Sequence, residues 1–175
     1  MRLMRRKIDD FLKEWKENED RLPLIVKGAR QIGKTASIMQ FANDNYKNVV
    51  AINFVLQQKF KSIFDDGYDV DSIVRNITLI DPSIELEPGN TIFFFDEMQD
   101  CPVCATSLKA FKIDGRYDVV CSGSLMGINY QEIESNSVGY KEDYTMHSMD
   151  FEEFLWAKGY DSAFVERLFE KMVSV

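Results

Sequence analysis

Apolar residues along the chain follow two different spacings, and these spacings predict its secondary structure. Short continuous apolar, β-prone runs predict strands, whereas apolar residues three and four positions apart predict amphipathic helices. The predicted strands are residues 22–26, 49–54, 91–95, 117–121 and 144–149. The predicted helices are residues 8–17, a segment that begins at Lys34, most of 57–80, 104–113, the segment that follows Asp150, and 161–173.

Strands that alternate with helices predict an α/β fold. In this three-layer arrangement, helices flank both faces of a mainly parallel five-stranded sheet. The run at 91–95 (TIFFF) is apolar throughout, as expected for a strand that is buried on both faces. A length of 175 residues fits one domain, 1–175. Within it we expect an N-terminal helical segment at 1–20 and C-terminal helices at 150–175.

The charge balance of the chain restricts its partners. The net charge is −8 and the isoelectric point is near 4.7, which argues against direct nucleic-acid binding, because such binding draws on Lys and Arg contacts to phosphates. No apolar run approaches the roughly 20 residues that span a bilayer. The basic N-terminus is followed by Asp9 and Asp10 instead of the apolar stretch of a signal peptide. We therefore expect a cytoplasmic protein with no membrane partner. Four basic side chains near the N-terminus are expected to be solvated, or to contact a binding pocket if they lie near one: Arg2, Arg5, Arg6 and Lys7.

The turn after the first predicted strand reads GARQIGKT, residues 28–35, and matches the phosphate-binding pattern GxxxxGK[ST] in full. In this pattern glycines let backbone N–H groups surround phosphate oxygens, a lysine supplies positive charge, and a hydroxyl binds Mg²⁺. The N-terminus of the following helix adds its dipole. Without a preceding strand and a following helix, the match would indicate no more than a glycine-bearing turn. We expect ATP or ADP to contact one continuous segment: Gly28, Ala29, Arg30, Gln31, Ile32, Gly33, Lys34, Thr35 and Ala36.

Asp96 and Glu97 come directly after the buried strand 91–95. A carboxylate at that end of a parallel strand, near the phosphate-binding turn, is suited to hold Mg²⁺ together with Thr35. An adjacent glutamate can orient and deprotonate the attacking water. Taken alone, the pair would indicate two solvated acids that end a strand. Combined with the upstream motif, it predicts a P-loop NTPase fold with Glu97 and Lys34 as catalytic residues.

Two further features bear on the type of nucleotide enzyme. The strand-like run 49–54 lies between the two motifs, which fits the large ATPase branch and is unusual for P-loop small-molecule kinases. Ser122 and Ser124 follow the predicted strand 117–121. They are candidate catalytic residues that contact the γ-phosphate or the attacking water, and equally they are ordinary turn residues.

Three cysteines, Cys101, Cys104 and Cys121, are expected to be reduced, because the count is odd and no signal peptide is present. Cys101 and Cys104 form a CxxC pair, which is typical of redox and zinc sites. Zinc would need two more ligands, and the one histidine of the chain, His147, is distant in sequence. We therefore favour ordinary buried thiols.

The runs GARQIGKT, FFFDEMQ, SLKAF, CSGSLMG and MDFEEFL occur in this order, and the chain resembles the bacterial and archaeal AAA-type ATPases of the AAA_14 group from about residue 20 to 160. The resemblance implies ATP and Mg²⁺ as ligands. It also implies Asp96 as the metal-binding acid, Glu97 as the catalytic glutamate, and Ser122 or Ser124 as a sensor serine. Such proteins usually continue into a lid or winged-helix region and a domain that resembles restriction endonucleases. The chain is then either the N-terminal part of a longer protein or a degenerate short member of the family, and we favour the first.

One position departs from the family pattern. A glycine–arginine pair commonly precedes the last strand, whereas this chain has Gly139-Tyr140 followed by Lys141. An arginine there can stabilise transition-state charge, and a lysine lacks its planar fork. The departure puts efficient hydrolysis in doubt and leaves nucleotide binding intact. His147 stands where an aromatic residue is frequent, and we interpret it as a packing or surface residue.

Two functions follow from these features. The first is Mg²⁺-dependent ATP hydrolysis, with adenine expected because no guanine-reading NKxD motif occurs. The second is a nucleotide-dependent switch with little hydrolysis. The apolar residues of 161–173 are typical of a core face, and they could also meet a further domain, a protein partner or a second copy of the chain: Phe164, Val165, Leu168, Phe169 and Met172.

Overall fold

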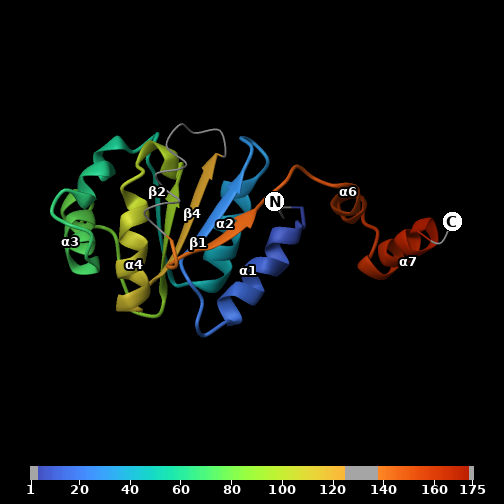
Figure 1. Ribbon diagram of the computed structural model, residues 1–175, viewed down its shortest axis with the longest axis horizontal. Helices are drawn as coiled ribbons and strands as arrows, with labels where there is room; N and C mark the ends of the chain where they lie inside the picture. Colours follow the sequence, from blue (N-terminus) through green and yellow to red (C-terminus); the bar gives the residue numbers. More distant parts are fainter. Residues whose placement is uncertain (1–3, 125–137, 174–175) are drawn as a thin grey trace.

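The computed structural model describes residues 4–124 and 138–173, and their centre is a five-stranded, all-parallel sheet (Figure 1). The strand order is β2-β3-β4-β1-β5. This confirms the predicted α/β fold. The strands are β1 (Leu24–Gly28), β2 (Asn48–Asn53), β3 (Thr91–Asp96), β4 (Asp118–Ser124) and β5 (Glu142–Thr145).

Helices cover both faces of the sheet, because successive side chains of a strand point to opposite faces. Phe93 and Phe95 pack with residues of α3 and α4, whereas Ile92 and Phe94 pack with residues of α1 and α2. Figure 1 shows these two helical layers on either side of the strands. The helices are α1 (Lys7–Glu17), α2 (Lys34–Asn45), α3 (Val70–Ile80), α4 (Cys104–Asp114), α6 (Phe151–Ala157) and α7 (Ser162–Val173), with 3₁₀ turns η1 (Gln58–Phe64) and η2 (Met98–Asp100).

Three element boundaries differ from the sequence prediction. The segment 57–80 divides into η1 and α3 around Gly67, whose φ of +133° suits glycine, and Asp69 then caps α3 by accepting from the Ser72 N–H at 2.9 Å. The last strand covers 142–145 and not 144–149. The fourth strand runs on to Ser124, so Ser122 and Ser124 lie inside β4 and not in a turn after it.

The sheet order separates the two motif strands. β1, which leads into the GARQIGKT loop, and β3, which ends at Asp96, lie on either side of β4. β2, the strand that lies between the motifs along the chain, is at the edge of the sheet. All strands of a parallel sheet end on the same side. The carboxyl ends of β1, β3 and β4 therefore lie next to one another on that side of the sheet.

The N-terminal basic residues are not uniformly solvated, and this corrects the prediction for Arg6 in particular. Arg6 is 8% exposed. Arg5 donates to Ser162 and Asp10, and its guanidinium lies 4.4 Å from the ring centroid of Trp156. Arg2 lies outside the described residues.

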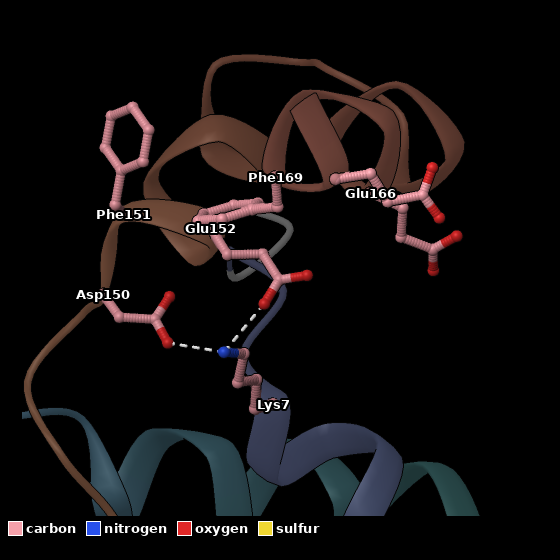
Figure 2. A pocket seen from close by; sticks show the side chains of 7 residues that line it. Lys7, Asp150, Phe151, Glu152, Glu166 and Phe169 are labelled. Atoms are coloured by element: carbon pink, nitrogen blue, oxygen red, sulfur yellow. Dashed lines mark hydrogen bonds and ion pairs between the residues drawn. The ribbon is translucent and has the colours of Figure 1, made fainter. Parts of the chain in front are cut away.

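Helices α6 and α7 extend away from the sheet beyond β5 (Figure 1). Lys7 of α1 reaches the first turn of α6, where its Nζ lies 2.6 Å from Asp150 Oδ2 and 2.8 Å from Glu152 Oε2 (Figure 2). These two carboxylates raise the pKa of Lys7. The surrounding cavity of about 960 Å³ also contacts Phe151 and Phe169, so part of the α7 apolar stripe faces this space. No helix in the described part of the chain is long and apolar enough to cross a bilayer.

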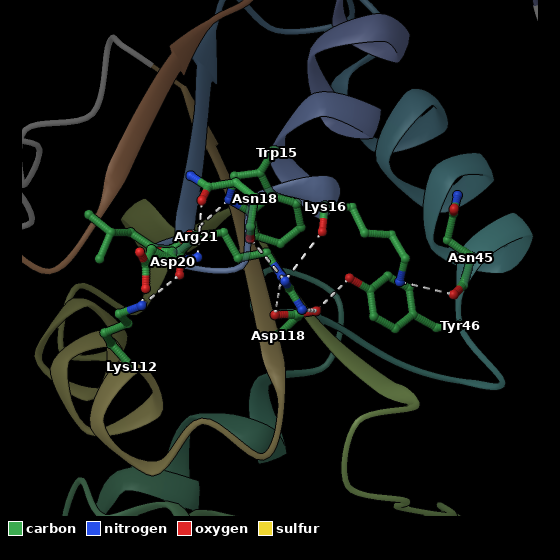
Figure 3. A network of polar contacts seen from close by, with 10 residues as sticks. Trp15, Lys16, Asn18, Asp20, Arg21, Asn45, Tyr46, Lys112 and Asp118 are labelled. Atoms are coloured by element: carbon green, nitrogen blue, oxygen red, sulfur yellow. Dashed lines mark hydrogen bonds and ion pairs between the residues drawn. The ribbon is translucent and has the colours of Figure 1, made fainter.

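A polar network joins α1, α2 and β4 where β4 begins, at the end of the sheet opposite to the carboxyl ends of the strands (Figure 3). Arg21 donates to both carboxylate oxygens of Asp118, at 2.8 and 2.9 Å. The hydroxyl of Tyr46 donates to the same carboxylate at 2.7 Å. Burial first, and the Asp118 charge second, raise the pKa of Tyr46, which keeps its hydroxyl protonated as a donor.

Candidate nucleotide-binding site

The loop between β1 and α2 has the backbone that a phosphate-binding turn requires. Gly33 has a φ of +99° and Gln31 a φ of +62°, so the backbone passes through the left-handed region twice. A Cβ atom at Gly28 would lie 2.4 Å from the backbone oxygen of Met146. Glycine is therefore needed at position 28 because another backbone segment approaches it closely.

Lys34 begins α2 and is 8% exposed. Its Nζ donates to the backbone oxygens of Gly28 at 3.1 Å and Ala29 at 2.6 Å. Burial lowers the pKa of Lys34, and the nearby carboxylates of Glu97 and Asp96 oppose that shift. The ammonium therefore lies inside the loop, between its carbonyl groups and the acidic pair.

Asp96 ends β3, is 5% exposed, and collects three polar side chains from three other elements. Thr35 Oγ1 donates to Asp96 Oδ2 at 3.1 Å, and Asn53 Nδ2 donates to the same oxygen at 2.9 Å. The hydroxyl of Ser122 donates to Asp96 Oδ1. A carboxylate with two hydroxyl oxygens beside it, those of Thr35 and Ser122, is an oxygen donor set of the kind that Mg²⁺ prefers, so these residues fit a magnesium site.

Glu97 follows immediately and has a φ of +56°, an uncommon conformation for a residue with a side chain. Its carboxylate accepts a hydrogen bond from Gln99 Nε2. Gln99 Oε1 in turn accepts from the backbone N–H of Ser124 at 3.2 Å. Backbone strain of this kind concentrates at functional sites.

The structure brings the predicted site residues to one edge of the sheet. The loop residues lie between β1 and α2, Asp96 and Glu97 at the end of β3, and Ser122 and Ser124 at the end of β4. Ala29, Arg30, Gln31, Thr35 and Ala36 are exposed, Ile32 and Gly33 are partly exposed, and Gly28 and Lys34 are buried. Leu125–Gly127 of the CSGSLMG run lie outside the described residues.

Three residues of the site were missed by the sequence analysis: Asn53, Gln99 and Arg6. Arg6 donates through Nη1 to the backbone oxygen of Ile32 at 2.8 Å and through Nη2 to that of His147 at 2.9 Å. A polar residue at the end of a predicted strand was the available signal for Asn53. No local pattern distinguishes Arg6 from its basic neighbours.

A cavity of about 360 Å³ adjoins the phosphate-binding loop. Gly33 and Ile32 of the loop form one side, and Ser37 of α2 and Met149 form others. Met4 and Arg6 complete the lining from the N-terminal segment. The cavity is mostly apolar and lies beside the loop between β1 and α2.

Tyr140 and Lys141, at the position where an arginine was expected, contact residues outside the loop between β1 and α2. Lys109 Nζ lies 4.9 Å from the ring centroid of Tyr140. The ammonium of Lys141 pairs with Asp143, which also pairs with Lys27 at 2.9 Å. The side chain of His147 is exposed.

The three cysteines are free and buried among apolar residues between the sheet and α4. Burial raises the pKa of Cys101 to about 11 and that of Cys104 well above its ordinary value, so both thiols stay protonated near neutral pH. Within residues 4–124 and 138–173, no group of three or more His, Cys, Asp or Glu side chains is arranged to hold a metal ion.

Solved structures with some likeness to this chain include C. elegans PCH-2, Drosophila ORC bound to GC-rich DNA and Cdc6, and Thermotoga maritima RuvB. Their TM-scores are 0.48, 0.48 and 0.47 at 13%, 12% and 16% identity. They cover 81%, 80% and 79% of this chain, and 42%, 55% and 43% of their own. At these scores the likenesses support no conclusion about function.

An uncharacterised protein of Haemophilus influenzae is 24% identical over 154 residues, which span 86% of this chain and 36% of that protein. The chain thus spans about a third of the length of this relative. The AAA_14 family model, described as an AAA domain, matches residues 20–155 and includes the loop, the acidic pair and the serines of β4. The chain therefore belongs to the AAA_14 family of AAA-type ATPase domains.

Proposed function

We propose that this domain binds ATP with Mg²⁺ and hydrolyses it, with Glu97 as the general base. The observation that carries the proposal is the convergence of Lys34, Thr35 and Asp96: the Thr35 hydroxyl lies 3.1 Å from the Asp96 carboxylate, and Lys34 lies inside the loop beside them. Lys34 binds the phosphates, and Thr35 and Asp96 hold the metal. Mg²⁺ supplies charge neutralisation for the phosphoryl group.

The remaining residues have roles that follow from their positions. Glu97 orients and deprotonates the attacking water. Ser122 fixes the Asp96 carboxylate through its hydroxyl, and Ser124, at the end of β4, would contact the γ-phosphate or the attacking water. The apolar cavity beside Gly33 accommodates the adenine base, since an aromatic ring is stabilised by apolar walls.

A nucleotide-dependent switch is the second candidate function. The pairing of Lys141 with Asp143 favours it, because an engaged lysine does not supply the transition-state charge of an arginine. A domain that follows in a longer protein, or a second copy, is a partner for both functions. The aromatic side chains of α6 and α7 that are exposed here are a candidate contact: Phe151 (53% exposed), Phe154 (45%) and Phe164 (41%).

The test compares ATP binding by calorimetry with phosphate release, each with and without Mg²⁺. Lys34→Ala should abolish binding. Glu97→Gln should retain binding and lower turnover by at least about 100-fold, within the range for a general base. Lys47→Ala and Glu14→Gln are matched controls, because both side chains are exposed and neither belongs to the loop, β3 or β4.

The outcomes separate the two functions. Turnover in wild type that Glu97→Gln abolishes supports hydrolysis. Binding without turnover in wild type supports the switch. If wild type does not bind ATP, both functions are excluded for this domain.

A further inference from the structure

Gln99 follows Glu97 by two positions in η2, and its side chain is 9% exposed. Its Nε2 donates to Glu97 Oε2 and, at 3.2 Å, to Asp100 Oδ2. Its Oε1 accepts from the Ser124 N–H at 3.2 Å. One amide therefore bridges the carboxylate of Glu97 and the backbone at the end of β4.

The orientation of this amide is determined from both sides. A flipped amide would place Oε1 against the carboxylates of Glu97 and Asp100, and Nε2 against the N–H donor of Ser124. Carboxylates only accept hydrogen bonds, and a backbone N–H only donates. The flipped amide would therefore lose all three hydrogen bonds, and the observed orientation is the one that satisfies them.

Gly123 leaves the space that Gln99 occupies. A Cβ atom at Gly123 would lie 3.2 Å from Gln99 Oε1 and 3.3 Å from Met98 Cγ, which is tighter than ordinary contacts. A side chain at position 123 would therefore push the amide away from Ser124. The absence of a side chain at Gly123 of β4 thus leaves room for the Gln99 amide of η2.

The backbone conformation and the partial exposure of Glu97 indicate why its carboxylate needs a fixed contact. Glu97 has a φ of +56°, and η2 follows at once, with the Asp100 N–H donating to the backbone oxygen of Glu97 at 3.0 Å. The carboxylate is partly exposed, so water would otherwise compete for it. A general base must be held in a defined geometry to be effective.

We propose that Gln99 is a positioning residue that fixes the carboxylate of Glu97 relative to the end of β4 through the Ser124 N–H. The inference rests on the proposed function of Glu97 as general base. Its consequence is that a displacement of the end of β4, at Ser124, is transmitted to the Glu97 carboxylate through the Gln99 side chain.

The first test does not depend on turnover. In the ¹⁵N-labelled chain without nucleotide, Glu97→Ala should shift the side-chain amide resonance of Gln99 and the backbone amide resonance of Ser124. In a Gln99→Ala background, Glu97→Ala should leave the Ser124 resonance unchanged, because the bridge is absent. An equal Ser124 shift with and without Gln99 would overturn the inference.

The second test measures single-turnover hydrolysis and ATP affinity. Gln99→Ala should lower the hydrolysis rate by about 10- to 100-fold, the range for a misplaced catalytic group, and should leave the ATP dissociation constant within about twofold. In a Glu97→Gln background it should have no further effect, because the group that it positions is gone. Gln58→Ala, at an exposed position of η1, is the control.

Gly123→Ala offers a route to the same effect without altering the glutamine. Gly123→Ala should reproduce part of the loss in hydrolysis rate that Gln99→Ala causes. In a Gln99→Ala background, Gly123→Ala should lower the hydrolysis rate no further. Wild-type rates for Gln99→Ala, with Glu97→Gln inactive, would overturn the inference and leave the proposed function intact. Indistinguishable rates for wild type and Glu97→Gln would exclude Glu97 as the base, and the resonance measurements would still decide whether Gln99 links Glu97 to β4.

Discussion

Arg6 and Glu153 form a buried ion pair between the N-terminal segment and the first turn of α6: Arg6 Nε lies 3.1 Å from Glu153 Oε1, with the side chains 10% and 6% exposed. Nε has no hydrogen-bond acceptor in line with its N–H, so this contact is electrostatic. The two terminal nitrogens donate to the backbone oxygens of Ile32 and His147. One guanidinium thus joins the phosphate-binding loop to α6.

Removal of Arg6 should therefore destabilise the domain strongly. Arg6→Met leaves the Glu153 carboxylate buried without its cation, and breaking such a pair costs about 3–5 kcal/mol. The measurement is the free energy of unfolding in urea. Arg5→Met is the matched control, since Arg5 is 48% exposed and an exposed pair contributes at most about 1 kcal/mol. Equal effects of the two substitutions would show that burial does not strengthen the Arg6 contact.

Lys34 gives a prediction with a defined pH dependence. Burial lowers its folded-state pKa below the unfolded value, so in the window between the two the unfolded chain binds more protons. The contribution of Lys34 to the free energy of unfolding therefore rises as pH increases through that window. The unfolding free energy of wild type, relative to Lys34→Met, should increase from pH 7 toward pH 10.

Urea titrations at three pH values in this range measure the effect. Lys47→Met serves as the control, because Lys47 is 66% exposed and paired with Glu87, so it should lack the rising trend. A constant or falling difference between wild type and Lys34→Met would show that the ammonium is not desolvated in the loop. Lys34→Met should also lose ATP binding while its unfolding free energy at pH 7 stays within about 1 kcal/mol of wild type.

The fold and part of the candidate site could be predicted because their signals are local. The continuous apolar run at 91–95 indicates a strand buried on both faces, and the loop motif names its own residues from Gly28 to Thr35. The acidic pair was found because it directly follows that strand. In each case the physical requirement and the residue that meets it are neighbours along the chain.

The rest of the site depends on contacts between distant segments. Asn53 meets Asp96 from a strand 43 positions earlier, and Arg6 meets Ile32 across 26 positions. Gln99 follows the acidic pair, yet its role depends on Ser124, 25 positions later. The predicted solvation of Arg6 was wrong for this reason: its neighbours in sequence are exposed, and its partners come from the loop and α6.

The Arg21–Asp118 pair predicts a measurable coupling at the opposite edge of the sheet. Asp118→Asn weakens two charge-assisted hydrogen bonds from Arg21 and one from Tyr46, and we expect a loss of about 1–3 kcal/mol in unfolding free energy. Tyr46→Phe alone should cost about 1 kcal/mol. The double variant should cost less than the sum, because both changes act on one carboxylate. Additive losses would show that the Tyr46 hydroxyl contributes to stability independently of the Asp118 carboxylate.

Gly28→Ala separates two reasons for which glycine is required at this position: the close approach of Met146 and the φ of +159°. A methyl group at Gly28 would lie 2.4 Å from the Met146 oxygen, and this backbone atom cannot move without displacing the segment after β5. We expect a loss of about 3 kcal/mol in unfolding free energy, at the upper end for overpacking, together with weakened ATP binding. Gly115→Ala is the control, because Gly115 has a φ of +71° in open space and should lose about 1 kcal/mol from backbone strain alone. Urea denaturation followed by circular dichroism compares the two variants. Equal losses would mean that the close approach to Met146 relaxes at little cost, and that conformation alone requires glycine at position 28.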